Sequence, residues 1–295
     1  MSSPVDKDIG AARLEAAEPL DSRRFELAVR RLADSLGAGT WRSPFKGPGI
    51  DYVQSRRYQA GDPVKVIDWK VTARTGHTYV KDYELPKRMP VYLVIDSSAS
   101  MAVASRPPSK YALAVQLAGG LARLAQDCLS PVALVGAGSR RLRSRPTLAH
   151  GQVYAWLHSL RSYRFDERTE LDRRLDELGA SLSERSLVLV LSDLQCAGAK
   201  RALERLRQRH DCAVVRLVDP AETGVAGGGF IRGREAESGR RVVAPASRRW
   251  FDPESELVAL RRSGIDAISI VTGEPFIPQL RRFLEDRHLI VGGAG

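Results

Sequence analysis

Three side chains with oxygen donors stand at the end of one apolar segment. The run Val91–Ile95 is followed by Asp96, Ser98 and Ser100 in an Asp-x-Ser-x-Ser pattern. An uninterrupted apolar run is typical of a buried parallel strand, and open α/β sheets bind ligands beyond the C-terminal ends of such strands. One carboxylate and two hydroxyls are hard donors that suit Mg²⁺ better than a soft metal. The pattern therefore predicts a metal site before it predicts an enzyme.

Two further oxygen donors are expected at the same edge of the sheet. Asp193 directly follows the apolar run LVLVLS, and Thr169 lies just before the helical stretch that leads to that run. Because the tips of neighbouring parallel strands converge at one edge, these side chains are expected to surround one octahedral ion. The predicted ligands are Asp96, Ser98, Ser100, Thr169 and Asp193. Mg²⁺ is the expected ion, with Mn²⁺ or Ca²⁺ as alternatives, and its open position suits a carboxylate of a protein partner.

Each of these residues also has a purely structural interpretation. Asp-x-Ser after a strand is often a helix N-cap, and Thr169 is placed to cap a helix that begins at Glu170. Asp193 is equally compatible with a turn. The complete set, in this order and on a frame of alternating strands and helices, favours the metal site.

Strand-like runs and helical stretches alternate from Pro90 onward. The predicted strands are Val91–Ile95, Val132–Val135, Leu187–Leu191, Ala213–Val218 and Ala267–Val271. The predicted helices are Lys110–Gln126, Gln152–Leu160, Glu170–Leu182, Ala199–Arg209, Glu254–Arg262 and Ile277–Asp286. This alternation predicts an α/β fold with a mostly parallel sheet flanked by helices. The segment Phe230–Val243 interrupts it and predicts a short antiparallel hairpin on the sheet edge.

The chain before Pro90 has a different organisation. Residues 1–20 are aperiodic and are expected to form a flexible tail. A helix is predicted from Asp21 or Ser22 to Leu36, with an apolar stripe at Phe25, Val29, Leu32 and Leu36. We therefore divide the chain into the tail (1–20), an N-terminal helix with a small β-rich extension (21–89), and the α/β domain (90–295).

Charge and composition narrow the function classes. The 295-residue chain has a formal net charge of +11, which admits nucleic acid or an acidic protein as a partner. Its arginines are spread along the predicted helices as pairs, no five-residue basic run appears, and only 6% of the residues are aromatic. Stacking platforms for nucleic acid are therefore not evident. This distribution favours an arginine bias on solvated helix faces, and a basic surface for an acidic protein partner is the main alternative.

The same composition predicts a cytoplasmic protein. No apolar run approaches the roughly 20 residues of a membrane span, and the N-terminus lacks the apolar core of a signal peptide. Three isolated cysteines, Cys128, Cys196 and Cys212, fit neither a disulfide framework nor a CxxC metal cluster. They are expected to be buried thiols.

Two parts of the sequence resemble known families. Pro90–Gly295 resembles a von Willebrand factor A domain, because Asp96–Ser100 matches the metal-ion-dependent adhesion site motif of that family. Thr169 and Asp193 then take the second and third positions of that site. The upstream string is similar to the signature of the bacterial domain-of-unknown-function 58 (DUF58) family; its matching residues are Arg57-Tyr58, Gly61-Asp62, Ile67-Asp68-Trp69 and Ala73-Arg74. The resemblance implies a non-enzymatic, metal-dependent protein-binding module that works with a MoxR-type AAA+ ATPase in the assembly or maturation of other proteins.

The upstream string admits two interpretations. In the functional interpretation, a partner surface or a second polar site is formed by Asp62, Asp68, Trp69 and Arg74. In the structural interpretation, Trp69 and Tyr58 pack a small β subdomain against the α/β domain, while Asp68 and Arg74 pair to orient it.

Two other function classes stay open beside the adaptor, namely a metal-dependent hydrolase and a basic nucleic-acid-associated factor. Phosphotransferases of the haloacid-dehalogenase type need a second Asp two residues after the first, where this chain has Ser98. The chain has no GxSxG elbow, Walker A loop or GxGxxG motif, and none of its five histidines follows a predicted strand in a telling place. These absences favour a protein without enzymatic activity.

Overall fold

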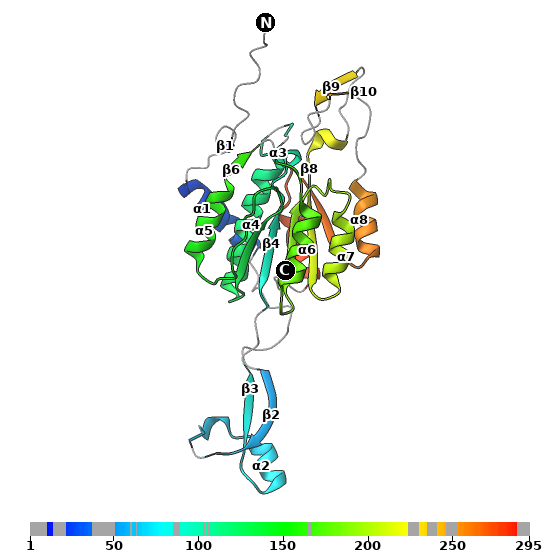
Figure 1. The fold of residues 1–295 in the computed structure, drawn as a ribbon. Helices are drawn as coiled ribbons and strands as arrows, with labels where there is room; N and C mark the ends of the chain where they lie inside the picture. Colours follow the sequence, from blue (N-terminus) through cyan, green and yellow to red (C-terminus); the bar gives the residue numbers. More distant parts are fainter. Residues whose placement is uncertain are drawn as a thin grey trace.

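The computed structural model describes residues 11–13, 22–36, 51–59, 61–62, 64–84, 89–102, 104–105, 107–164, 167–223, 230–234, 241–245 and 253–287. A five-stranded sheet lies at its centre (Figure 1). Its strands are β4 (Val91–Ile95), β5 (Val132–Gly136), β7 (Leu187–Ser192), β8 (Asp211–Val218) and β11 (Asp266–Val271). Their order is β11-β8-β7-β4-β5, and all four pairings are parallel.

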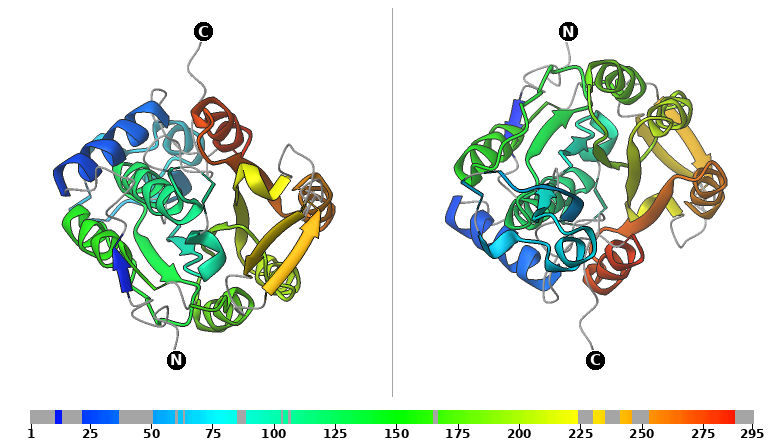
Figure 2. Two further views of the ribbon diagram at one scale, coloured as in Figure 1. Left: turned by 90° about the horizontal axis from the view of Figure 1, so that it is seen from above. Right: turned by 90° about the horizontal axis from the view of Figure 1, so that it is seen from below.

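Helices cover both faces of this sheet (Figure 2). One face carries α1 (Ser22–Leu36), α4 (Lys110–Asp127), α5 (His150–Leu160) and α9 (Ile277–Asp286). The other carries α6 (Leu171–Ser181), α7 (Ala199–Arg207) and α8 (Pro253–Arg262). Alternate residues of each strand serve the two layers; in β4, Leu93 packs in the first core and Val94 in the second. Because both faces are buried, the strands are continuous apolar runs rather than alternating ones.

The N-terminal helix belongs to the first layer. The predicted apolar stripe of α1 is buried, with Val29 and Leu32 against α4. The close approach depends on two glycines of α4, since a Cβ on Gly119 would lie 2.5 Å from Val29 Cγ2 and one on Gly120 would lie 2.7 Å from Leu32 Cδ2. The predicted fold class, an α/β sheet flanked by helices with an N-terminal helix, is confirmed.

The predicted hairpin exists but does not extend the central sheet. β9 (Phe230–Arg234) and β10 (Arg241–Pro245) pair antiparallel with each other in a separate two-stranded sheet. In the part of the chain that is described, β11 is the edge of the central sheet on that side. The expected Glu–Ser–Gly turn lies outside the described residues.

A small arm projects from the opposite end of the molecule (Figure 1). Strands β2 (Asp51–Arg57) and β3 (Tyr79–Glu84) pair antiparallel, and between them lie a 3-10 turn (Val64–Val66) and α2 (Trp69–Thr75). Because β3 precedes β4 in the chain, the arm joins the sheet at its N-terminal edge. This is the edge away from the predicted metal site.

The arm does not use its aromatic side chains to pack against the α/β domain, as one interpretation of the sequence predicted. Trp69 is 67% exposed and Tyr58 is 39% exposed, so neither is buried against the sheet. Asp68 accepts a hydrogen bond from Ser55 Oγ at 2.7 Å and caps α2 through the amides of Lys70 and Val71. The carboxylate of Asp68 is thus occupied by the arm itself. The expected Asp68–Arg74 pair is replaced by a helix cap.

Other sequence expectations fall partly within the described residues. Of residues 1–20, only β1 (Ala11–Arg13) is described, and it pairs antiparallel with β6 (Ser162–Arg164). All three cysteines are free thiols, but Cys196 is only partly buried. Within the described ranges, every helix is too short or too polar to cross a bilayer.

Candidate metal centre

The candidate site lies beside β4, where the order in which the chain adds strands to the sheet reverses. From β4 the chain first moves outward to β5 and later returns to place β7 on the other side of β4. Such a switch point leaves a crevice at the C-terminal edge in which α/β sheets bind ligands. Asp96 follows β4 and Asp193 comes just after β7, and the Asp96 amide bonds to the Leu191 carbonyl at 2.9 Å. Two carboxylates are therefore brought to the same edge of the sheet.

Asp96 is held from two sides. Its Oδ1 accepts from the Ser98 amide at 3.0 Å, and its Oδ2 accepts from Ser192 Oγ at 2.6 Å. The residue is only 1% exposed. Burial, followed by the negative charge of Asp193, raises the pKa of Asp96 to about 7. A bound cation would relieve both effects by favouring the ionised carboxylate.

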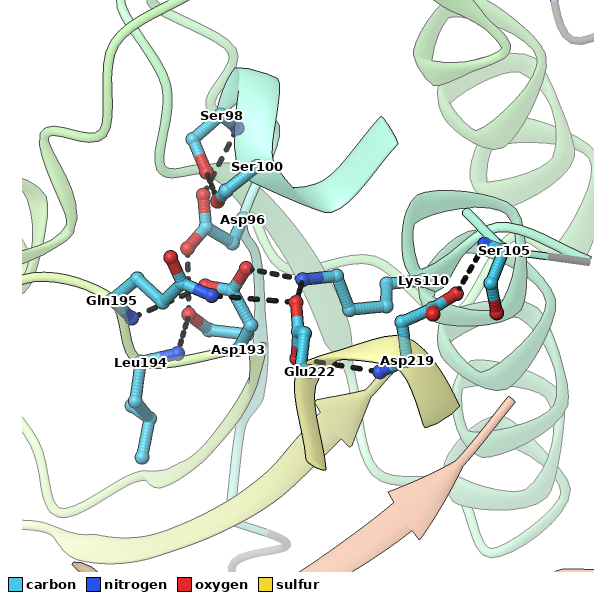
Figure 3. Close-up of polar contacts among 11 residues, drawn as sticks. Asp96, Ser98, Ser100, Ser105, Lys110, Asp193, Leu194, Gln195, Asp219 and Glu222 are labelled. Carbon is cyan, nitrogen blue, oxygen red and sulfur yellow. Dashed lines mark hydrogen bonds and ion pairs between the residues drawn. The ribbon is translucent and has the colours of Figure 1, made fainter. Parts of the chain in front are cut away.

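The two serines of the motif lie together beside Asp96 (Figure 3). Ser98 Oγ and Ser100 Oγ are 3.0 Å apart and share a hydrogen bond. Ser100 belongs to the short helix α3 (Ala99–Ala102), and both serines are buried. Two hydroxyl oxygens and one carboxylate therefore face the same small region.

Asp193 is paired with a lysine. The Lys110 ammonium donates to Asp193 Oδ2 at 2.8 Å, and Lys110 is completely buried. Asp193 Oδ1 accepts from the Gln195 amide at 3.1 Å. Burial alone lowers the pKa of Lys110, but the carboxylates of Asp193 and Glu222 outweigh it, and the net pKa lies above the ordinary value. Lys110 is therefore a charged ammonium inside the site.

Glu222 supplies a second acceptor for this ammonium. It lies on the 3-10 turn Pro220–Thr223 after β8, and its Oε1 pairs with Lys110 and accepts from Gln195 Nε2 at 3.3 Å. The neighbouring Asp219 accepts from the amides of Ser105 at 2.7 Å and Ala221 at 2.9 Å. The tip of β8 therefore closes the side of the site next to Lys110 (Figure 3).

Thr169 lies on a loop that is fastened to the motif. The Ala99 amide donates to the Glu167 carbonyl at 2.8 Å, and Ser97 Oγ donates to Glu167 Oε2 at 2.7 Å. The opposite carboxylate oxygen of Glu167 pairs with Arg140. Thr169 itself forms a backbone bridge with Gly138. Its hydroxyl oxygen is buried and has no hydrogen-bond partner among the described residues, which leaves it free to act as a ligand.

The donor set fits a hard divalent ion. Carboxylates of Asp96 and Asp193 and hydroxyls of Ser98, Ser100 and Thr169 are the oxygen types that Mg²⁺ prefers. Each bonded carboxylate oxygen keeps a second lone pair. The described residues contain no group of three or more His, Cys, Asp and Glu side chains placed to hold a metal. An ion here would therefore depend on the hydroxyls.

Sequence reasoning missed three residues that contact this site. Ser192 is the last residue of β7, and Lys110 is the first residue of α4. The positive charge of a lysine in the first turn of a helix is repelled by the positive end of the helix dipole. A lysine at this position therefore indicates that nearby acidic groups stabilise it. Asp219 directly follows β8 in the way that Asp96 and Asp193 follow their strands, and Glu222 lies on the 3-10 turn just beyond it. Applying the strand-tip argument to β8 would have found Asp219 and pointed to the turn that carries Glu222.

Comparison with known proteins identifies the family. The family described as Protein of unknown function DUF58 matches residues 54–254, and the chain belongs to it. An uncharacterized protein of Mycobacterium tuberculosis is 27% identical over 294 residues, which cover 95% of this chain and 92% of that protein.

Two solved structures are similar to this chain at low sequence identity. BatB, a conserved hypothetical protein from Bacteroides thetaiotaomicron, has a TM-score of 0.46 and 15% identity over 68% of this chain and 98% of its own. The SpRpn10 VWA domain has a TM-score of 0.40 and 11% identity over 70% of this chain and 100% of its own.

Proposed function

We propose that this chain is a non-enzymatic, Mg²⁺-dependent adaptor that binds an acidic side chain of a protein partner. The observation that carries the proposal is the gathering of Asp96, Ser98 and Ser100 with Asp193 at one switch point, where each donor is a hard oxygen. The buried, partnerless hydroxyl of Thr169 supports a fifth ligand. Mn²⁺ or Ca²⁺ are alternative ions. The ion would supply positive charge for a partner's carboxylate.

The chemistry around the serines supports binding rather than catalysis. A serine nucleophile needs a base within hydrogen-bond reach. His77 lies in the arm, His150 and His158 lie on α5, and His210 precedes β8 at the N-terminal edge of the sheet. None of the hydrogen bonds or ion pairs made by the described histidines involves Ser98 or Ser100. The hydrolase alternative has no candidate base among them.

The basic charge supports a protein partner more than nucleic acid. Several arginines are engaged by neighbouring acids, such as Arg205 with Asp176 at 2.7 Å and Arg174 with Glu177 at 2.9 Å. Charge that is paired within the fold adds little to phosphate binding. We propose that the acidic side chain of the protein partner binds at the metal centre. We also propose a MoxR-type AAA+ ATPase as the protein with which the adaptor works.

A binding experiment tests this function. The purified chain is immobilised, and a co-expressed MoxR-type ATPase from the same organism is passed over it in Mg²⁺ or in EDTA. Binding is expected in Mg²⁺, and EDTA or Asp96→Ala should reduce it at least tenfold. Asp127→Ala, which removes a half-exposed carboxylate at the end of α4, is the matched control and should bind normally. Equal binding with EDTA would contradict the metal-dependent contact, and turnover of phosphate or ester substrates would favour the hydrolase.

A further inference from the structure

Lys110 places a positive charge inside the proposed metal centre. Its side chain is 0% exposed, and its ammonium donates to Asp193 Oδ2 at 2.8 Å. Asp193 is one of only two carboxylates in the proposed ligand set. The ammonium therefore lies against one of the two carboxylates that are proposed to bind the divalent ion.

The ammonium has a second acceptor that is not a proposed ligand. Glu222 pairs with Lys110 through Oε1, and its side chain is 18% exposed whereas that of Asp193 is 1% exposed. Gln195 links both acids, since its amide donates to Asp193 and its side chain donates to Glu222. Lys110 can thus release Asp193 without losing all of its charge pairing.

The local charge favours exchange of one cation for another. Without a bound ion, Asp193 and Glu222 together carry two negative charges against the single charge of Lys110. A divalent ion beside Asp193 would repel the ammonium, and a buried ammonium needs a charged partner to stay in place. Glu222 meets that need.

We propose that Lys110 is an internal cation that competes with a divalent ion for Asp193, and that Glu222 retains the ammonium when the ion binds. This inference rests on the proposed function, because it concerns the occupancy of the same site. It makes ion affinity a property set by Lys110 as well as by the ligands.

Direct titration of the intact chain tests the inference. EDTA-treated, desalted protein is titrated with Mn²⁺, and free Mn²⁺ is followed by its electron paramagnetic resonance signal. Lys110→Met removes the charge while keeping an unbranched side chain, and it should bind Mn²⁺ at least tenfold more tightly than wild type. Lys200→Met makes the same charge change at a half-exposed surface lysine and should bind like wild type. An affinity of Lys110→Met equal to or below wild type overturns the inference.

A double-mutant cycle separates Glu222 from a general field effect. Glu222→Gln should weaken Mn²⁺ binding about fivefold in wild type, because the ammonium then has only Asp193 as a charged partner. In the Lys110→Met background the same change should have less than a twofold effect. An equal effect in both backgrounds overturns the role of Glu222. Circular dichroism on each variant verifies folding. If Lys110→Met does not fold, Glu222→Gln in the wild-type background, a near-isosteric change, still tests the role of Glu222, and unchanged Mn²⁺ affinity in that variant overturns it.

The outcomes distinguish this inference from the proposed function. If wild type binds Mn²⁺ and Lys110→Met binds no better, the inference fails and the metal-dependent adaptor stands. If only Lys110→Met binds, the competition is supported and the native chain is not a metal-dependent adaptor. If neither binds, both are overturned.

Discussion

Ser192 Oγ donates a hydrogen bond of 2.6 Å to Oδ2 of Asp96, although the two residues are 96 positions apart in the chain. The same hydroxyl accepts from the Leu194 amide at 2.8 Å, so its position is fixed by the turn after β7. Ser192 thereby sets the orientation of the carboxylate that follows β4. Groups that orient a ligand in this way commonly change metal affinity by about 10–100-fold when they are removed.

Ser192→Ala should therefore weaken Mn²⁺ binding by about tenfold without changing the ligand set. The measurement is a Mn²⁺ titration of the EDTA-treated chain. Ser186→Ala, at a buried serine just before β7 on the opposite edge of the sheet, is the control and should leave the affinity unchanged. Unaltered affinity in Ser192→Ala would show that Asp96 needs no such support or is not a ligand.

Gly138→Ala should loosen the loop that carries Thr169. A Cβ at Gly138 would fall on Glu167 Oε2 and Ser97 Oγ, which hydrogen-bond to each other. Overpacking of this kind costs about 1–3 kcal/mol of unfolding free energy, and we expect a loss in that range by urea denaturation. Gly151→Ala, with no atom within 4 Å of the new Cβ, should be neutral or stabilising. Equal stability of the two variants would show that Gly138 does not lie against Glu167 and Ser97 as described.

The arm should lose local stability when its helix cap is removed. Asp68 caps α2 and also holds Ser55 of β2, so Asp68→Ala should destabilise the arm by about 1 kcal/mol. Limited proteolysis should then cut within the arm sooner than in wild type. Trp69→Ala should leave the cleavage rate unchanged, because the Trp69 side chain is 67% exposed. Faster cleavage in Trp69→Ala would reveal packing that this exposure does not predict.

His210 should make the fold acid-sensitive. The residue is buried, and neither ring nitrogen has a partner among the described residues. Burial, followed by the charge of Arg209, lowers the pKa of His210 below its ordinary value of 6.5. The unfolded chain therefore binds a proton near pH 6.5 that the folded chain takes up only at lower pH, and the contribution of His210 to stability falls as pH drops below about 6.5.

His210→Leu should flatten this part of the stability profile, measured by urea denaturation between pH 7.5 and 5. His158→Gln, at an exposed histidine of α5, is the control and should keep the wild-type slope. A slope that persists in His210→Leu would assign the acid sensitivity to other groups.

Much of the fold was predictable because its signals are local. The strand Val91–Ile95 and the helix Ile277–Asp286 have the predicted bounds, and the α1 stripe is buried as expected. Continuous apolar runs and helical periodicity are set by burial of the segment itself. The expectation that Asp96 and Asp193 share an edge follows from the geometry of parallel strands, and the structure brings them there. That a metal binds here, and which metal it is, stays a prediction.

By itself, the sequence determined the strand–helix alternation, the α/β class and the strand-tip positions of the candidate ligands, because these depend on residues that are near one another in the chain. Only the tertiary structure decided that Lys110 enters the site between Asp193 and Glu222, and that the arm leaves from the opposite edge with Trp69 exposed. The contacts of Lys110 with Asp193 and Glu222 join residues that are 83 and 112 positions apart in the chain. Their geometry depends on how whole elements pack, since a buried charge is stable only where the complete fold supplies its partners.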